Sequence, residues 1–180
     1  MSKKLSLTIR EEKPADYEPV ESLIQQAFAS AEHSDGNEHR LVKNLRNSDA
    51  FISRLSMVAE HNEKIVGYVL LTKIKIKNKE KEFDSLALAP VSVLPEFQNK
   101  GIGGKLIEAA HLQAKSMGFT SVVLLGHQDY YPKFGYKPAY TFGISFPFEA
   151  PSENCMALEL FPGSLSEISG EVVYPNAFFE

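Results

Sequence analysis

The first third of the chain alternates between polar stretches and regularly spaced apolar residues. Leu5 to Arg10 alternates apolar with polar side chains, which is typical of a strand with one buried face. Pro14 suits the first turn of a helix, and a second short helix is predicted to begin near Asn37 after a polar break. Helical spacing puts these apolar side chains inward: Tyr17, Val20, Leu23, Ile24, Ala27 and Phe28, then Leu41, Val42 and Leu45. The same spacing puts these basic side chains outward: Arg40, Lys43 and Arg46.

Two hairpins are predicted in the middle of the chain. Residues 55–60 and 64–77 have the composition of strands and are joined by a tight turn at 61–63. A second turn at 78–81 leads through Glu82 into a central strand over 86–94. Both connections are too short for a crossover, so both pairs are expected to be antiparallel.

The stretch from Leu86 to Met117 combines a strand, a glycine-rich turn and a helix. Val91 and Val93 favour a buried strand, and Pro95 ends it because proline has no N–H for the ladder. Helically spaced apolar residues follow, and Gly118 stands where a helix C-cap belongs. The apolar run 121–125 is then expected to lie parallel to the central strand in a right-handed β-α-β unit.

These elements predict an α/β (α+β) fold with a mixed, mostly antiparallel sheet and helices on both faces. The last forty residues give weaker signals, and 141–148 and 154–160 are predicted as closing strands. The terminal segment 172–179 is apolar, so we expect it to pack on the domain or against a second copy in a homodimer.

The glycine-rich turn has the features of an anion site. The first-turn N–H groups of a helix lack intrahelical partners, and the helix dipole adds positive potential there. Gly101, Gly103 and Gly104 can adopt positive φ and admit phosphate oxygens, while Lys100 and Lys105 add charge.

Two common phosphate motifs do not fit this turn. A P-loop needs glycine where Asn99 stands and a hydroxyl where Leu106 stands. A dinucleotide fingerprint beginning at Gly101 also needs glycine at position 106. A nucleotide-binding protein is therefore disfavoured, and a turn that merely connects a strand to a helix is the remaining structural alternative.

The run from Val91 to Leu106, VSVLPEFQNKGIGGKL, resembles the coenzyme A loop of the GNAT superfamily of acyl-CoA N-acyltransferases, with its Gln/Arg-x-x-Gly-x-Gly/Ala motif. Downstream, Tyr131 to Tyr136 resembles the Tyr-x-x-x-Gly-Phe element that closes the cofactor site in that family. The resemblance covers roughly residues 5–139. It implies one N-acetyltransferase domain over 1–180, with a core at 5–139 and a closing segment at 140–180.

The resemblance also implies which residues bind acetyl-CoA, and it requires no metal. The pantetheine arm is expected to pair with the backbone of Val91 and Val93, and the N–H of Val93 or Leu94 to face the thioester carbonyl. An oxyanion donor of this kind is typically worth ~3 kcal/mol. The pyrophosphate is expected on the N–H groups of Gln98, Asn99, Lys100, Gly101, Ile102, Gly103 and Gly104.

Tyr131 matches the family's general acid, which protonates the leaving thiolate. Two alternatives stay open: a tyrosine that only packs on the cofactor, and neighbouring Tyr130 in the same role. The general base is not identified. Glu82 and Asp84 begin the central strand, and water is a further alternative. His127 follows the parallel strand, where a structural role is commoner.

Composition adds weaker constraints. The net charge of −4 argues against nucleic acid and for cationic acceptors. The five histidines show no metal-ligand spacing, but Glu32, Asp35 and Glu38 could line a pocket for a cationic amine; His33 and His39 lie beside them. With one cysteine, Cys155, and no membrane or signal segment, the chain is expected to be cytoplasmic and to have no membrane partner.

The sequence therefore predicts an N-acetyltransferase that moves an acetyl group from acetyl-CoA to an amine by direct attack on the thioester. The alternative is a non-catalytic acyl-CoA-binding module with a regulatory or partner-binding role, which the lack of an obvious base keeps open. The acceptor itself is not specified by these patterns.

Overall fold

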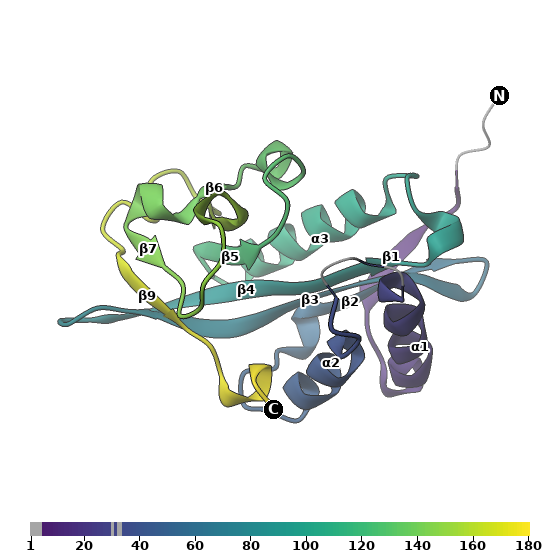
Figure 1. Ribbon diagram of the computed structural model, residues 1–180. Helices are drawn as coiled ribbons and strands as arrows, with labels where there is room; N and C mark the ends of the chain where they lie inside the picture. The colour runs from purple at the N-terminus through teal and green to yellow at the C-terminus, as the bar shows by residue number, and fades with distance from the viewer. Residues whose placement is uncertain (1–4, 30, 32–33) are drawn as a thin grey trace.

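A mixed sheet of nine strands organises the fold of the computed structural model, which describes residues 5–29, 31 and 34–180. The strand order is β1-β2-β3-β4-β5-β8-β6, with β9 paired to β3 and β7 to β9 (Figure 1). The strands are β1 (Thr8–Glu11), β2 (Ser56–His61), β3 (Lys64–Lys77), β4 (Glu82–Val93), β5 (Ser121–Leu125), β6 (Lys137–Pro138), β7 (Ile144–Ser145), β8 (Cys155–Glu159) and β9 (Gly170–Val173). Among the described strands only β4–β5 and β7–β9 are parallel pairs, so the predicted mostly antiparallel sheet is confirmed.

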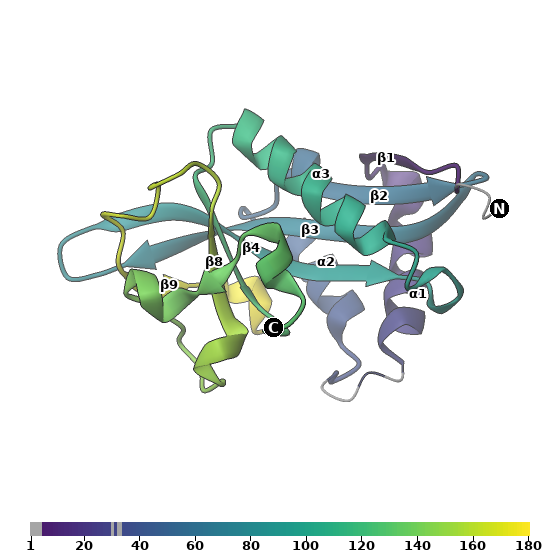
Figure 2. The ribbon, with the colours of Figure 1, turned by 90° about the horizontal axis from the view of Figure 1, so that it is seen from above.

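Helices cover both faces of this sheet, as predicted. Helix α3 (Ile102–Ser116) lies on one face, and α1 (Tyr17–Phe28) and α2 (Glu38–Arg46) lie on the other (Figures 1 and 2). Their apolar stripes form the core with the sheet, and these helical side chains are fully buried or nearly so: Val20, Leu23, Ile24, Val42, Leu45, Leu106, Ile107, Ala110 and Ala114. Gly118 follows α3 with φ of 89°, which confirms the predicted left-handed end of that helix.

Strands β4 and β5 separate beyond their first paired residues. They pair in parallel only at Leu86 with Val122 and at Ala87 with Val123, although β4 continues to Val93. The β3–β4 register shifts between Val69 and Leu71, where β4 carries one residue more than β3. The second half of β4 is therefore a sheet edge inside the molecule, with β3 on one side and no strand of the described chain on the other.

The backbone alternation of β4 decides which groups this open edge presents. The N–H of Leu94 donates to the carbonyl of Val66 at 2.9 Å, so Leu94 faces β3. In an antiparallel ladder neighbouring residues alternate in direction, so the N–H and C=O of Val93 and Val91 face away from β3. The structure thus presents both residues at the open edge.

Several predicted boundaries are wrong near the chain ends. The first strand is Thr8–Glu11, and Pro14 begins a short 3-10 turn before α1. The strand predicted over 141–148 shrinks to the two residues of β7, because a 3-10 turn and Gly143 at φ of 74° interrupt it. The strand β9 was not predicted. The apolar tail folds back on the domain, where Ala177 is buried and Phe178 packs against the core.

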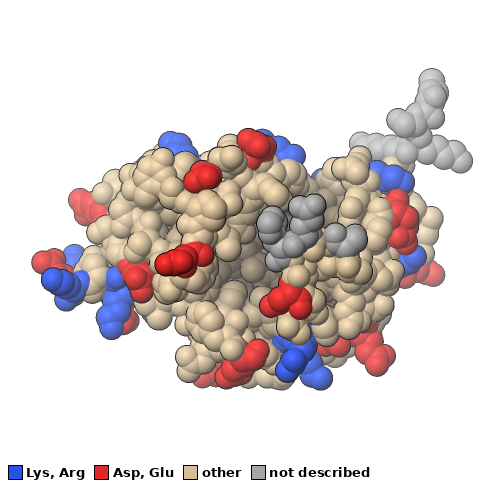
Figure 3. Space-filling model, in the orientation of Figure 1, with Lys and Arg blue, Asp and Glu red and all other residues tan. Residues whose placement is uncertain are grey.

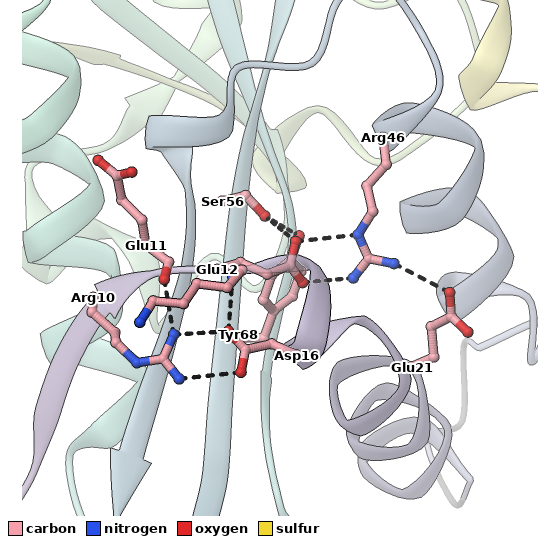
Figure 4. A network of polar contacts seen from close by, with 9 residues as sticks. Arg10, Glu11, Glu12, Asp16, Glu21, Arg46, Ser56 and Tyr68 are labelled. Atoms are coloured by element: carbon pink, nitrogen blue, oxygen red, sulfur yellow. Dashed lines mark hydrogen bonds and ion pairs between the residues drawn. The ribbon is translucent and has the colours of Figure 1, made fainter.

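Arg46 is the clearest error in the predicted helices, since it points inward. Its guanidinium donates to Glu12 at 2.6 Å and to Glu21 at 3.1 Å (Figure 4). The side chains of Arg46 and Glu12 are only 5% and 1% exposed. Glu12 also accepts from the hydroxyl of Ser56 at 2.9 Å. The helical spacing predicted that Arg46 faces solvent. Its ion pair with Glu12, which follows β1 and is distant in sequence, instead accounts for its burial.

None of the helices in the described part of the chain has the length and apolar character needed to cross a membrane.

Candidate active site

The glycine-rich turn leads into the N-terminus of α3 with its N–H groups free. The first helical hydrogen bond runs from the N–H of Lys105 to the carbonyl of Gly101, so Ile102, Gly103 and Gly104 donate to no helical carbonyl. No side chain of the described residues caps this end. The arrangement is an exposed set of donors at the positive end of a helix dipole, which favours an anion.

Backbone conformation in this turn agrees with the prediction at one glycine of three. Gly101 has φ of 82° and is left-handed, but Gly103 and Gly104 are helical and do not have positive φ. Asn99 supplies the second left-handed residue, with φ of 63°. Asparagine tolerates this region better than most side chains. The turn thus bends at Asn99 and Gly101.

The absent side chains of Gly103 and Gly104 matter for space instead. A Cβ on Gly103 would lie 3.4 Å from the hydroxyl oxygen of Tyr130 and 3.8 Å from a methyl of Val93. A Cβ on Gly104 would lie 3.5 Å from the ring of Phe134. The first turn of α3 is therefore covered by two aromatic side chains and the open edge of β4, with room for little more than a methyl group.

Basic side chains flank the same turn. The ammonium of Lys133 lies 4.0 Å from the ring centre of Tyr130, and that of Lys100 lies 5.5 Å from the ring centre of Phe97. At the open edge, the side-chain amide of Gln98 donates to the carbonyl of Val93 at 3.0 Å. Gln98 therefore links the turn to the strand, and the local charge favours a phosphorylated ligand.

A cavity of about 760 Å³ opens beside the separated strands. Its lining comes from parts of the chain that are far apart: Phe28, Ala31, Ser34, Glu38, Leu41, Ala87, Leu88, Ala89, Pro90, Val91, Leu124, Leu125, Gly126, His127, Tyr131, Phe148, Tyr174, Phe178 and Phe179. The volume is in the range of small-molecule sites. The cavity is thus largely apolar and borders the open edge of β4.

Tyr131, the predicted general acid, lies in this cavity, as does Val91 of the predicted cofactor site. The ring of Tyr131 contacts Tyr130 edge-on, with centroids 5.0 Å apart, and Tyr136 at 5.8 Å. Burial, with a smaller contribution from Tyr130, raises the pKa of Tyr131 to about 12. The hydroxyl is therefore protonated at neutral pH and can donate a proton. Tyr130 covers the glycine turn instead and does not line the cavity.

Tyr136, whose ring contacts Tyr131, forms a hydrogen-bonded pair with His111. The hydroxyl of Tyr136 and Nε2 of His111 are hydrogen-bonded at 2.8 Å. Burial lowers the pKa of His111 to about 4, so the imidazole is neutral at physiological pH. Burial also raises the pKa of Tyr136 well above its ordinary value. Tyr136 therefore contacts the ring of Tyr131 as a member of an uncharged pair.

The other predicted polar candidates divide into two groups. His127 and Glu38 line the cavity, and Glu38 accepts a hydrogen bond from the hydroxyl of Ser34. Asp84 and Glu82 lie near the β3–β4 hairpin turn, paired with Lys75 and Lys77, and are not among the lining residues. The start of β4 therefore contributes no base to this cavity.

Asp35, a further predicted acidic residue, is not among the residues that line the cavity. Asp35 is exposed, and its carboxylate accepts from the N–H of Asn37 at 2.9 Å. Glu32 and His33 lie outside the described residues. No group of three or more potential metal ligands occurs within 5–29, 31 and 34–180.

The aromatic residues that line the cavity were not predicted as site residues from the sequence. Phe148, Tyr174, Phe178 and Phe179 come from the closing segment, and only the apolar character of the tail indicated that it packs on the domain. Phe28 was assigned to the core of the first helix. Aromatic residues in an irregular segment carry no periodic signal, so their convergence required the folded chain.

Known proteins match this chain in sequence and in structure. A family model described as an acetyltransferase (GNAT) domain matches residues 53–138. The chain is similar to YjhQ, an uncharacterized N-acetyltransferase of Escherichia coli K12, with 29% identity over 161 residues that cover 88% of this chain and 86% of YjhQ.

Two solved structures resemble it closely. A GNAT family acetyltransferase of Brucella melitensis, solved with acetyl-CoA, has a TM-score of 0.79 and 31% identity, covering 97% of this chain and 99% of that one. The GNAT family N-acetyltransferase YhbS of Escherichia coli, solved with CoA, has a TM-score of 0.88 and 22% identity, covering 100% and 96%. At 22% identity the second likeness concerns the fold alone.

Proposed function

Because the chain belongs to the GNAT superfamily of acyltransferases, we propose that it transfers an acetyl group from acetyl-CoA to an amine by direct attack on the thioester. One observation carries the proposal: the open edge of β4 at Val91 and Val93 joins the uncapped N-terminus of α3 to a cavity that contains Tyr131. This arrangement fits an extended ligand that has a pyrophosphate at one end and a reactive group at the other.

The pyrophosphate binds the free N–H groups of the turn and of the first turn of α3, from Asn99 to Gly104, whereas the N–H of Gln98, which was also predicted to bind it, already donates to the carbonyl of Pro95 at 3.3 Å. Its charge is favoured by the helix dipole and by the nearby ammonium groups of Lys100 and Lys133. The left-handed residues Asn99 and Gly101 bend the backbone around it. The relative solved with acetyl-CoA supports this assignment of the cofactor.

The pantetheine arm extends β4 as an added strand and pairs with the backbone of Val91 and Val93. The N–H of Leu94 already donates to the carbonyl of Val66. The thioester carbonyl therefore accepts a hydrogen bond from the N–H of Val91 or Val93. Such a donor stabilises the negative charge that develops on the oxygen, an effect typically worth ~3 kcal/mol.

The reaction is a single acyl transfer. A neutral amine attacks the thioester carbon, the C–N bond forms and the C–S bond breaks, and the electron pair leaves on sulfur. Tyr131 donates its phenolic proton to the thiolate, and the proton lost by the amine restores the phenol through solvent. Direct attack on a thioester needs no metal.

The test measures CoA thiol release and acetylated amine in the presence of an amine panel. We expect Tyr131→Phe to lower kcat on the order of 10²-fold, because it removes the general acid. The Michaelis constant for acetyl-CoA should change little. Tyr140→Phe is the matched control, since it removes an exposed hydroxyl that lies outside the cavity lining.

Three results would contradict parts of this proposal. A full rate in Tyr131→Phe would mean that this tyrosine only packs on the cofactor. A large loss in Tyr130→Phe alone would move the role of general acid to Tyr130. Tight acetyl-CoA binding without transfer to any amine would favour a non-catalytic acyl-CoA-binding module.

A further inference from the structure

The closing segment builds an aromatic wall on the cavity, formed by Phe148, Tyr174, Phe178 and Phe179. The rings of Phe148 and Tyr174 are stacked, with centroids 5.7 Å apart and planes 28° from parallel. Tyr174 also contacts Phe178 at 4.8 Å and Phe179 at 6.2 Å. The four rings thus form one continuous apolar surface.

Part of this wall is exposed to solvent in a way that a core would not be. Phe179 is 67% exposed and Phe148 is 39% exposed, although both line the cavity. Leu125, at the end of β5, is a further exposed apolar residue of the lining. Exposed apolar side chains that gather at one concave site are typical of a ligand surface.

The remaining lining extends the apolar surface from other elements. Phe28 comes from α1, Leu41 from α2, Leu88 from β4 and Leu124 from β5. A ligand body in this cavity therefore meets aromatic and aliphatic carbon from several elements. Such a lining binds an aromatic or branched apolar group by removing its surface from water.

Charge in the same cavity has one sign among the described residues. Glu38 is the one carboxylate of the described lining, and that lining contains no Lys or Arg. Glu38 begins α2, and the hydroxyl of Ser34 donates to its carboxylate. Figure 3 shows the surface hollowed next to the grey residues, with red carboxylates on both sides of the hollow. A carboxylate in a largely apolar cavity is stabilised by a cationic partner, because burying an unpaired charge costs free energy.

We propose that the acceptor is an amine with one ammonium group on an aromatic or bulky apolar body. The body packs on the aromatic wall, and Glu38 pairs with the ammonium group as it enters the cavity. The ammonium group then loses one proton to solvent, so that the neutral amine attacks the thioester. This inference rests on the proposed acetyl transfer and adds the class of its acceptor. It predicts weaker use of polyamines and of lysine side chains in polar peptides, because the wall offers their additional polar groups no partners.

The experiment compares acceptors at saturating acetyl-CoA. The panel contains 2-phenylethylamine, propylamine, spermidine and a polar lysine-containing peptide. We expect kcat/KM for 2-phenylethylamine to exceed that for propylamine roughly tenfold or more, since burial of an aromatic ring is strongly favourable. Phe179→Ser, at an exposed position of the wall, should reduce this preference by lowering kcat/KM for 2-phenylethylamine more than kcat/KM for propylamine.

The charge is tested by Glu38→Gln, with Glu18→Gln as the matched control on an exposed face of α1. We expect the first substitution to raise the KM for 2-phenylethylamine roughly tenfold, in the range of a lost charge-assisted contact, and to leave the KM for acetyl-CoA unchanged. The control should change neither constant.

The outcomes separate this inference from the proposed function. Faster acetylation of spermidine or the peptide than of 2-phenylethylamine would overturn the acceptor class and leave the acetyl transfer standing. An unchanged amine KM in Glu38→Gln would overturn the role of that carboxylate. If no amine were acetylated while acetyl-CoA still bound, both the transfer and the acceptor class would be rejected.

Discussion

At the scale of single residues, Gly126 determines where Tyr131 sits. A Cβ on Gly126 would lie 2.3 Å from the Tyr131 ring, well inside contact distance, and 3.2 Å from a methyl of Leu124. The first residue after β5 must therefore be glycine for this tyrosine to take its place in the cavity. The lack of a side chain at Gly126 thus sets the position of the Tyr131 ring.

We expect Gly126→Ala to displace the ring and to lower kcat on the order of 10²-fold, the usual consequence of a misplaced catalytic group. The measurement is a double-mutant cycle with Tyr131→Phe. Because both changes affect one function, the double variant should be little slower than either single variant. Melting curves would verify that all three variants fold.

Wild-type kcat in Gly126→Ala, or losses that multiply in the double variant, would show that Gly126 does not position Tyr131.

Residue-level prediction from sequence succeeded where a motif fixed the geometry. Gly101 is left-handed as expected. Gly103 and Gly104 lie inside the first helical turn, where the lack of a side chain leaves space next to Tyr130 and Phe134. A motif records that glycine is needed without recording why. Positive φ and close approach select the same residue type, so only coordinates distinguish them.

At the scale of elements, α2 is fixed at its C-terminal end by the buried pair of Arg46 with Glu12 (Figure 4). Its other end begins with Glu38, which lines the cavity. Ser56 and Tyr68, hydrogen-bonded to each other at 2.7 Å, tie the network to β2 and β3. The network therefore joins the sheet to the helix that contributes to the acceptor side of the site.

We predict that Arg46→Met lowers the free energy of unfolding by ~3–5 kcal/mol, because it leaves the Glu12 carboxylate buried without its cation. Lys64→Met is the matched control. Its pair with Glu96 is 3.6 Å long and both side chains are more than half exposed, so the loss should stay below about 1 kcal/mol. Urea titration at neutral pH measures both values.

Equal losses for Arg46→Met and Lys64→Met would contradict the view that the first pair is buried and the second is merely a surface contact.

Element-level prediction was accurate where periodicity was long and poor where partners were distant. Strand β3 has its predicted limits of 64–77, whereas β4 begins four residues before the predicted 86–94 and ends one residue before it. The spacing in α2 put Arg46 outward because Glu12, Tyr68 and Ser56 lie well outside the window of one helix. Strand β9 is four residues long and exists through its pairing with β3, so no local pattern marks it.

At the scale of the whole molecule, one split in the sheet creates two connected environments. On one side the uncapped start of α3 and nearby lysines favour a phosphorylated ligand, and on the other an aromatic chamber with Glu38 favours a cationic amine. The first could be predicted from sixteen consecutive residues, from Val91 to Leu106. The second is assembled from helices, strands and the tail. The sequence indicated Glu38 as part of a pocket for a cationic amine, but not the aromatic residues around it.

The central claim is that this split holds acetyl-CoA with its pyrophosphate at the start of α3. The most direct measurement is thermal unfolding of the wild type, Gly103→Trp and Leu112→Trp with acetyl-CoA, CoA, ATP or NADH. The space next to Gly103 admits little more than a methyl group, whereas Leu112 is 68% exposed on the same helix and serves as the control for an added indole.

We expect the wild type and Leu112→Trp to be stabilised by ~2.7 kcal/mol with either CoA species at a hundredfold excess over the Kd, and by neither ATP nor NADH. Gly103→Trp should lose the shift and still fold. No shift of the wild type with CoA or acetyl-CoA at millimolar concentration, or an equal shift in Gly103→Trp, would contradict the account.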